Sequence, residues 1–183
     1  MIIASRKRKE NIAEYLLYMW QIEDIIRGYG LDIDRIRTNH IDRIPDLTDE
    51  QRREMTDWYE SLIDMMRREG VAERGHLQIN RNIMEELADL HRALLADPKF
   101  GDYSAEFYRT LPYIVDLRSR AGSETEGEIE TCFTALYGLL LLRLQGKEVS
   151  PQTTEAMKQI SRFIATLSSY FHKNEQEPLF KND

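Results

Sequence analysis

The hydrophobic residues of this chain recur at intervals of three and four, the spacing that places side chains on one face of an α-helix. One such series runs through Ile79, Ile83, Leu87, Leu90 and Leu94. No segment shows the strict alternation of apolar and polar residues that is typical of a half-buried strand. The pattern predicts an all-α fold, a bundle of six or seven helices at 5–27, 33–44, 48–70, 76–96, 104–122, 125–145 and 150–174.

Several helix ends carry recognisable signals. Thr48 and Gln51 have the spacing of a capping box, and Ser150 followed by Pro151 is typical of a helix start. Pro112 lies inside the predicted helix at 104–122, where it cannot donate a backbone hydrogen bond. We therefore expect a kink or break near residues 108–111.

The predicted helix at 125–145 is apolar nearly all round, and it includes the four consecutive leucines at 139–142. A helix that is apolar on every side must be surrounded by other helices. We therefore expect it to be the centre of the bundle.

The predicted helix at 5–27 has more apolar surface than one stripe. Leu17, Tyr18 and Trp20 spread beyond the face formed by Ile12 and Leu16. Either two neighbouring helices clasp this helix, or part of its surface contacts another chain. The three residues are therefore candidates for an interface with a second copy or another protein partner.

The length and composition fit a single domain. The chain has 183 residues, of which 42% are hydrophobic, so it can form a core, and disorder is excluded. We see no internal repeat and no long linker. One helical domain over 1–183 is predicted, ending in a polar tail at about 175–183.

The charge argues against binding to nucleic acid, because the net charge is −7 and the basic run Arg6 to Lys9 is followed directly by Glu10. The single cysteine, Cys132, cannot form an intramolecular disulfide and fits a reducing compartment. No apolar run approaches the roughly 20 residues that span a bilayer. We expect a cytoplasmic protein with no membrane partner.

The sequence predicts no metal site, no cofactor and no catalytic residue. Helical di-metal sites use a Glu three residues before a His, so that both side chains share one face. Only Glu73 precedes a histidine, His76, in this way, and Gly75 between them makes helical spacing doubtful.

Two acidic pairs keep a catalytic alternative open. Asp57 with Glu60, and Glu86 with Asp89, loosely resemble the magnesium-binding pattern of all-α nucleotide pyrophosphohydrolases. Asp57 and Glu60 lie opposite the apolar stripe of their helix, which favours a solvated face. A metal-dependent nucleotide hydrolase is therefore the alternative, not the favoured hypothesis.

Three charged residues, Glu23, Arg118 and Arg143, fall within apolar faces. A lone buried ion is costly, so we expect Glu23 to pair with Arg118 or Arg143. Such a group would be either a structural ion pair or a polar pocket that holds a small anionic ligand through the arginines.

Residues 7–24, 75–80 and 128–140 resemble a bacterial family recorded only as a domain of unknown function. The resemblance spans nearly the whole chain and implies an all-helical fold. It brings no activity, cofactor or catalytic residue. The favoured hypothesis is a non-catalytic helical protein that acts through protein contacts.

Overall fold

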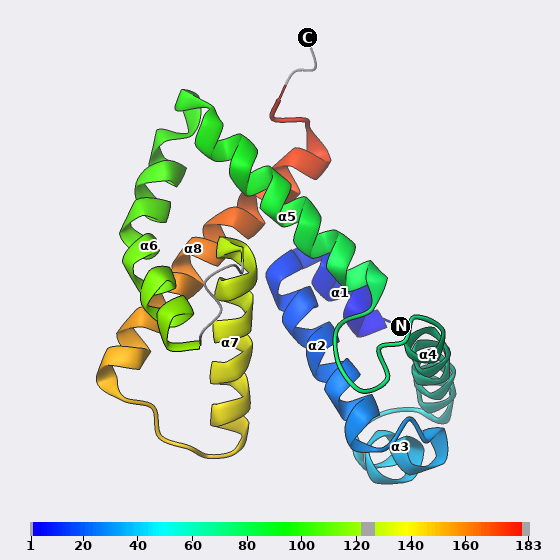
Figure 1. Cartoon of the computed structure of the whole chain (residues 1–183). Helices are drawn as coiled ribbons and strands as arrows, with labels where there is room; N and C mark the ends of the chain where they lie inside the picture. The colour runs from blue at the N-terminus through cyan, green and yellow to red at the C-terminus, as the bar shows by residue number, and fades with distance from the viewer. Residues whose placement is uncertain (1, 122–126, 181–183) are drawn as a thin grey trace.

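The all-α prediction is confirmed. A computed structural model describes residues 2–121 and 127–180, and in these ranges it contains helices and no strand. The predicted helix limits at 122 and 125 lie outside the described residues. None of the described helices combines the length and the hydropathy needed to cross a membrane. In chain order the elements are α1 (Ile2–Glu10), α2 (Ile12–Gly28), α3 (Ile33–Asn39), the 3-10 helix η1 (Ile41–Arg43), α4 (Asp49–Arg68), α5 (Gln78–Ala96), the 3-10 helix η2 (Pro98–Phe100), α6 (Gly101–Ala121), α7 (Glu128–Leu144) and α8 (Pro151–Gln176) (Figure 1).

The first predicted helix is in fact two helices, because Asn11 interrupts it. The Asn11 backbone is extended, and its side-chain oxygen accepts hydrogen bonds from the backbone N–H groups of Ala13 (3.0 Å) and Glu14 (3.2 Å). These bonds satisfy donors that a helix start leaves free, so Asn11 caps α2 and ends the continuity with α1.

Other helix ends follow the sequence signals. The capping box of Thr48 and Gln51 is present at the start of α4, and Ser150 caps α8. A break before Pro112 is ruled out, since α6 continues through this residue as one helix, and the alternative of a kink near residues 108–111 stays a prediction. Tyr108, whose carbonyl loses its helical partner, is on the exposed face, where water can replace the missing bond.

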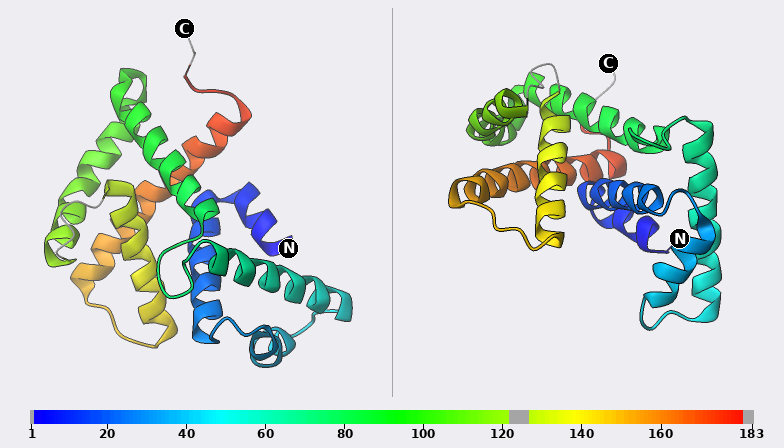
Figure 2. Two further views of the ribbon diagram at one scale, coloured as in Figure 1. Left: turned by 45° about the vertical axis from the view of Figure 1, so that its right-hand side comes forward. Right: turned by 60° about the horizontal axis from the view of Figure 1, so that its bottom comes forward.

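Helix α8 packs against α2, α5, α6 and α7, and α2, α5 and α7 each contact four α-helices as well. In all three views α6 lies on one side of the molecule, and α3 and α4 lie on the opposite side (Figures 1 and 2). Between them, α2 packs against α5, α7 and α8.

The prediction that α7 is surrounded along its length needs correction. Only its first half is buried, through Ile129, Thr131, Cys132 and Phe133. From 135 onward every residue up to 142 keeps some exposure, and Leu144 is 62% exposed. The reason lies in its neighbours: α5 covers the start of α7, where His91 and Ile129 line one small cavity, and not its end.

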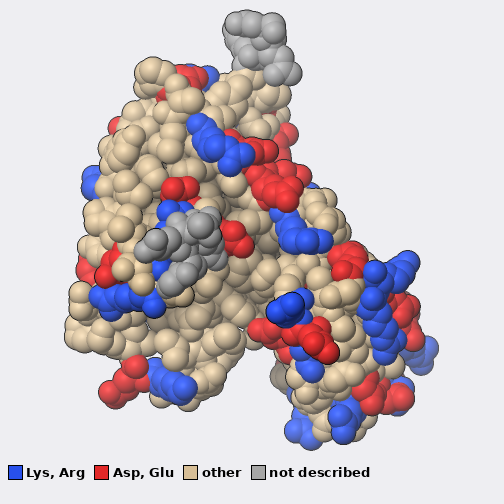
Figure 3. Space-filling model, viewed as in Figure 1, with Lys and Arg blue, Asp and Glu red and all other residues tan. Residues whose placement is uncertain are grey.

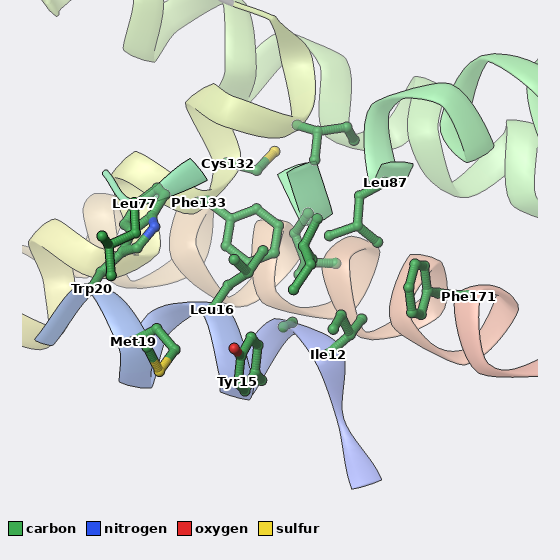
Figure 4. Packing of buried hydrophobic residues seen from close by; sticks show 14 of the residues in the cluster. Ile12, Tyr15, Leu16, Met19, Trp20, Leu77, Leu87, Cys132, Phe133 and Phe171 are labelled. Carbon is green, nitrogen blue, oxygen red and sulfur yellow. The ribbon is translucent and has the colours of Figure 1, made fainter. Parts of the chain in front are cut away.

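The core lies where α2, α5, α7 and α8 meet. Leu16 of α2, Leu87 of α5 and Phe133 of α7 converge there, and Cys132 is fully buried beside them (Figure 4).

The predicted polar tail begins later than expected. Helix α8 continues to Gln176, and the Phe180 ring lies 5.5 Å from the Phe100 ring. The Leu179 carbonyl accepts a hydrogen bond from Lys99 Nζ (2.6 Å). The segment before residue 181 is therefore attached to η2, and 181–183 lie outside the described residues.

Candidate functional site

Glu23 is the one fully buried carboxylate among the described residues, at 0% exposure. Its Oε1 accepts hydrogen bonds from the backbone N–H of Leu77 (2.9 Å) and from Asn80 Nδ2 (2.7 Å). Its Oε2 lies 2.6 Å from His76 Nδ1. Because an ionised carboxylate can only accept, the His76 proton is on Nδ1. Three donors thus replace the water that Glu23 has lost.

These donors all lie at the start of α5, which begins at Gln78. Leu77 is the N-cap residue and has no side chain able to cap the helix. Glu23 reaches across from α2 and takes over this role. A negative charge there is also favoured by the dipole of α5. Glu23 therefore clamps α2 to α5; we call Glu23, His76, Leu77 and Asn80 the Glu23 clamp.

Aromatic rings cover the clamp on the side of α7. The Trp20 and His76 rings stack with their centroids 4.2 Å apart, and Tyr137 of α7 meets Trp20 edge-on at 5.6 Å. The Tyr137 hydroxyl donates to Asp24 Oδ2 (2.6 Å). Burial, with the Asp24 carboxylate beside it, raises the pKa of Tyr137 well above its usual value. Tyr137 therefore acts as a neutral hydrogen-bond donor that joins α7 to α2.

Arg27 extends the same network to the loop before α5. Its Nη1 lies 2.8 Å from Asp24 Oδ1, and its Nη2 donates to the carbonyl oxygens of Val71 and Gly75. Gly75 has a φ of +85°, in the left-handed region that favours glycine. The loop is thus held from α2 at both of these carbonyls, which places His76 over Trp20.

The three segments on which the resemblance rests, 7–24, 75–80 and 128–140, therefore meet in one place. A carboxylate that orients a histidine is also found in general-base catalysis. In the described part of the chain, however, no hydroxyl or thiol hydrogen-bonds to His76. The arrangement holds three helices together.

The predicted ion pair between Glu23 and an arginine is wrong. Arg118 instead donates from Nε to Thr131 Oγ1 (3.1 Å) and lies 3.6 Å from Glu128. Arg143 is exposed near the end of α7. The donors of Glu23 come from residues 53 to 57 positions away in the sequence, and the periodicity of α2 carries no information about them.

His76 and Asn80 were not predicted from the sequence as partners of Glu23. One signal for Asn80 was present, because residues 77, 80, 83 and 87 share one helix face and Asn80 is its only polar member. The structure buries Asn80 to 1% exposure and leaves Ile79 38% exposed. The buried face of α5 therefore begins at Leu77, and Ile79 lies outside this face.

The structure does bring Arg143 close to one interface candidate. Arg143 and Leu17 line the same groove between α2, α7 and α8. Of the three charged candidates, Arg143 lines this groove, and Glu23 and Arg118 are not part of its lining. That Glu23, Arg118 or Arg143 takes part in binding a ligand stays a prediction.

The other two interface candidates differ in burial. Trp20 is 5% exposed, with His76, Phe133 and Tyr137 packed around it, whereas Tyr18 keeps part of its surface accessible. Lys7 of α1 lies over the Tyr18 ring at 5.9 Å. The wide apolar surface of α2 is thus clasped on two sides, and an interface through Leu17 and Tyr18 stays a prediction.

The acidic pairs are not assembled into a metal site. Asp57, Glu60, Glu86 and Asp89 are all exposed, and Asp89 pairs with Arg92. Across residues 2–121 and 127–180, no three His, Cys, Asp or Glu side chains come close enough to hold a metal ion.

A second buried polar contact joins α5 to α6. His91 Nδ1 lies 2.7 Å from the Tyr103 hydroxyl, and the rings of Phe107 and Phe163 pack against the imidazole. Burial lowers the pKa of His91 to about 4, so the imidazole is neutral at pH 7. Tyr103 is fully buried, and burial raises the pKa of its hydroxyl.

Together these features define an all-α protein with helices joined by a buried carboxylate and with an open groove beside it, a fold that does not by itself specify an activity. The chain belongs to the family described as domain of unknown function DUF4924, which matches residues 1–178. No curated protein and no solved structure matches the chain.

Proposed function

We propose that this chain is a non-catalytic helical protein that acts through protein contacts, and that its contact surface is the outer face of α6. Five residues of α6 follow one another at intervals of three or four and so share one face, and none is charged. We call this set the α6 ridge: Ala105, Tyr108, Pro112, Val115 and Ser119. All five are exposed, and Tyr108 (63%) and Val115 (55%) are among the most exposed large hydrophobic residues described.

The exposed Tyr108 and Val115 are the observation that carries the proposal, because apolar side chains two helical turns apart form a continuous apolar strip. In the space-filling view the upper part of the side that α6 forms is mostly uncharged, and charged residues lie along its edge and over its lower part (Figure 3). Leu17 and Tyr18 of α2 are more covered than these residues. The α6 ridge is therefore favoured over α2 as the interface.

The partner that fits best is a second copy of the chain. The chain has a net charge of −7, so most pairs of identical surfaces would repel each other. A twofold contact brings the same patch of each copy together, and the α6 ridge contributes no charge to it. The buried Cys132, the one cysteine of the sequence, is compatible with the cytoplasmic location that forms part of this proposal, in the bacterial cell that the family resemblance implies.

Sedimentation equilibrium at high micromolar concentration tests the proposal. We expect the native chain to be a dimer and Val115→Lys to be a monomer, because the substitution places two like charges in a twofold contact. Ser61→Lys, at an exposed position of α4, is the matched control and should remain a dimer. A native chain that is monomeric, or a Val115→Lys variant that still dimerises, would refute the α6 interface.

A further inference from the structure

The groove between α2, α7 and α8 has a volume of about 490 Å³ and two chemically different parts. Four of its lining residues are polar or charged and exposed, namely Arg143, Thr154, Lys158 and Ser161, and we call them the rim. The other five are apolar and at least partly buried, and we call them the floor: Leu17, Leu136, Leu139, Leu140 and Met157.

The two cations on the rim are not neutralised by the protein. In the described part of the chain neither Arg143 nor Lys158 has an ion-pair or side-chain hydrogen-bond partner, although Arg27, Arg109 and Arg118 each lie beside a carboxylate. The whole chain is acidic, with 32 Asp and Glu against 25 Lys and Arg. Among the described residues, the lining of the groove thus contains two unpaired cations and no carboxylate beside its apolar residues.

We propose that this groove binds a free fatty acid of medium chain length. The carboxylate would lie at the rim, where Arg143 can offer two parallel N–H donors and Lys158 a compact positive charge. The acyl chain would lie on the leucines of α7 and on Leu17 and Met157. The site does not overlap the α6 ridge, so it is independent of the proposed dimer.

The size of the groove agrees with such a ligand. Its volume is in the range of about 300–1,000 Å³ that is usual for small-molecule sites. On α7 it extends from Leu136 to Arg143, which is two helical turns or about 10 Å. A slender acyl chain can lie within it.

Isothermal titration of the full chain with hexanoate, octanoate and decanoate tests the proposal. We expect one saturable site and an affinity that increases about fourfold for each added methylene, as expected for apolar surface that becomes buried. Decyltrimethylammonium, with the same chain and a positive head, should bind at least tenfold more weakly than decanoate.

Two variants locate the site. Arg143→Gln and Lys158→Gln should each weaken decanoate binding about tenfold, because each removes one charge-assisted contact. Arg53→Gln, at an exposed arginine of α4 far from the groove lining, should leave it unchanged. Circular dichroism and melting temperature verify that all three variants are folded.

Four outcomes would overturn the proposal: no saturable binding of decanoate, equal binding of the ammonium analogue, no effect of Arg143→Gln, or binding to vesicles of phosphatidylglycerol without binding of decanoate. The last outcome would assign the groove to a lipid headgroup and not to a free acid.

Discussion

A fully buried carboxylate such as that of Glu23 is stable only when donors replace its lost hydration. Glu23 has three donors, and two of them, Leu77 and Asn80, are themselves buried. The Glu23 clamp fixes the start of α5 on α2, so a substitution of Glu23 affects both helices. Among single contacts, its loss should reduce the free energy of unfolding most.

Glu23→Gln should reduce the free energy of unfolding by about 2–3 kcal/mol. The amide removes the charge, and its NH2 group faces either the Nδ1 proton of His76 or the donors at Leu77 and Asn80. Chemical denaturation measures the effect. Glu14→Gln, an exposed position of the same helix, should change stability by no more than about 0.5 kcal/mol. Equal effects of the two substitutions would contradict the clamp.

His91 should make stability dependent on pH. Its pKa in the folded chain is about 4, below the value of 6.5 for a free histidine, because it is buried. Between these values the unfolded chain binds a proton that the folded chain does not. Stability should therefore fall as the pH decreases from 6.5 to 4, by on the order of 3 kcal/mol from this residue.

The variant His91→Phe isolates this contribution. Denaturation midpoints measured from pH 7 to pH 4 should decrease less steeply in the variant than in the native chain, whatever the offset caused by losing the bond to Tyr103. Parallel curves over this range would show that His91 is not the source.

At the scale of helices, local signals were sufficient where the cap lies next to its helix. Thr48 with Gln51 and Ser150 with Pro151 predicted the starts of α4 and α8. The break at Asn11 was missed although Asn11 and Glu14 have capping-box spacing, because the apolar series runs through both helices.

The capping box of α4 should make a measurable contribution to the free energy of unfolding. Thr48→Ala removes the acceptor of the Gln51 backbone N–H, a bond of 3.2 Å, and should cost about 1 kcal/mol. Thr38→Ala, at an exposed position within α3, is the control and should change stability by less than about 0.5 kcal/mol. Urea denaturation compares the two. An equal, small effect of both would mean that α4 does not depend on its cap.

The periodicity of one helix could not predict its contacts with segments that are distant in the sequence. An apolar surface all round α7 indicates that it can be buried, but whether neighbours reach its second half depends on where α5 and α8 end in space. In the same way the pattern identified Glu23 as a charge in an apolar face and could not identify His76 and Asn80 as its partners. The fold class could be predicted from the sequence. Of the residues of the Glu23 clamp, only Glu23 itself could be predicted.

At the scale of the whole molecule, α2 and α8 form the middle, and α6 is left with one face on the core and one face exposed. The buried face includes Tyr103, Phe107 and Ile114, and the exposed side carries the α6 ridge beside the charged Arg109, Asp116 and Arg120. A helix at the edge of a bundle normally exposes charged residues. An uncharged ridge at this place is what the proposed contact with a second copy explains.

Chemical cross-linking through a single introduced thiol tests this central claim most directly. The native Cys132 is buried, so Val115→Cys supplies the one accessible thiol, and Ser61→Cys on α4 is its control. With a short bis-maleimide linker we expect Val115→Cys to form a covalent dimer in high yield and Ser61→Cys to remain monomeric under denaturing electrophoresis. Equal yields from the two positions, or no cross-linked dimer from Val115→Cys, would contradict an interface on α6.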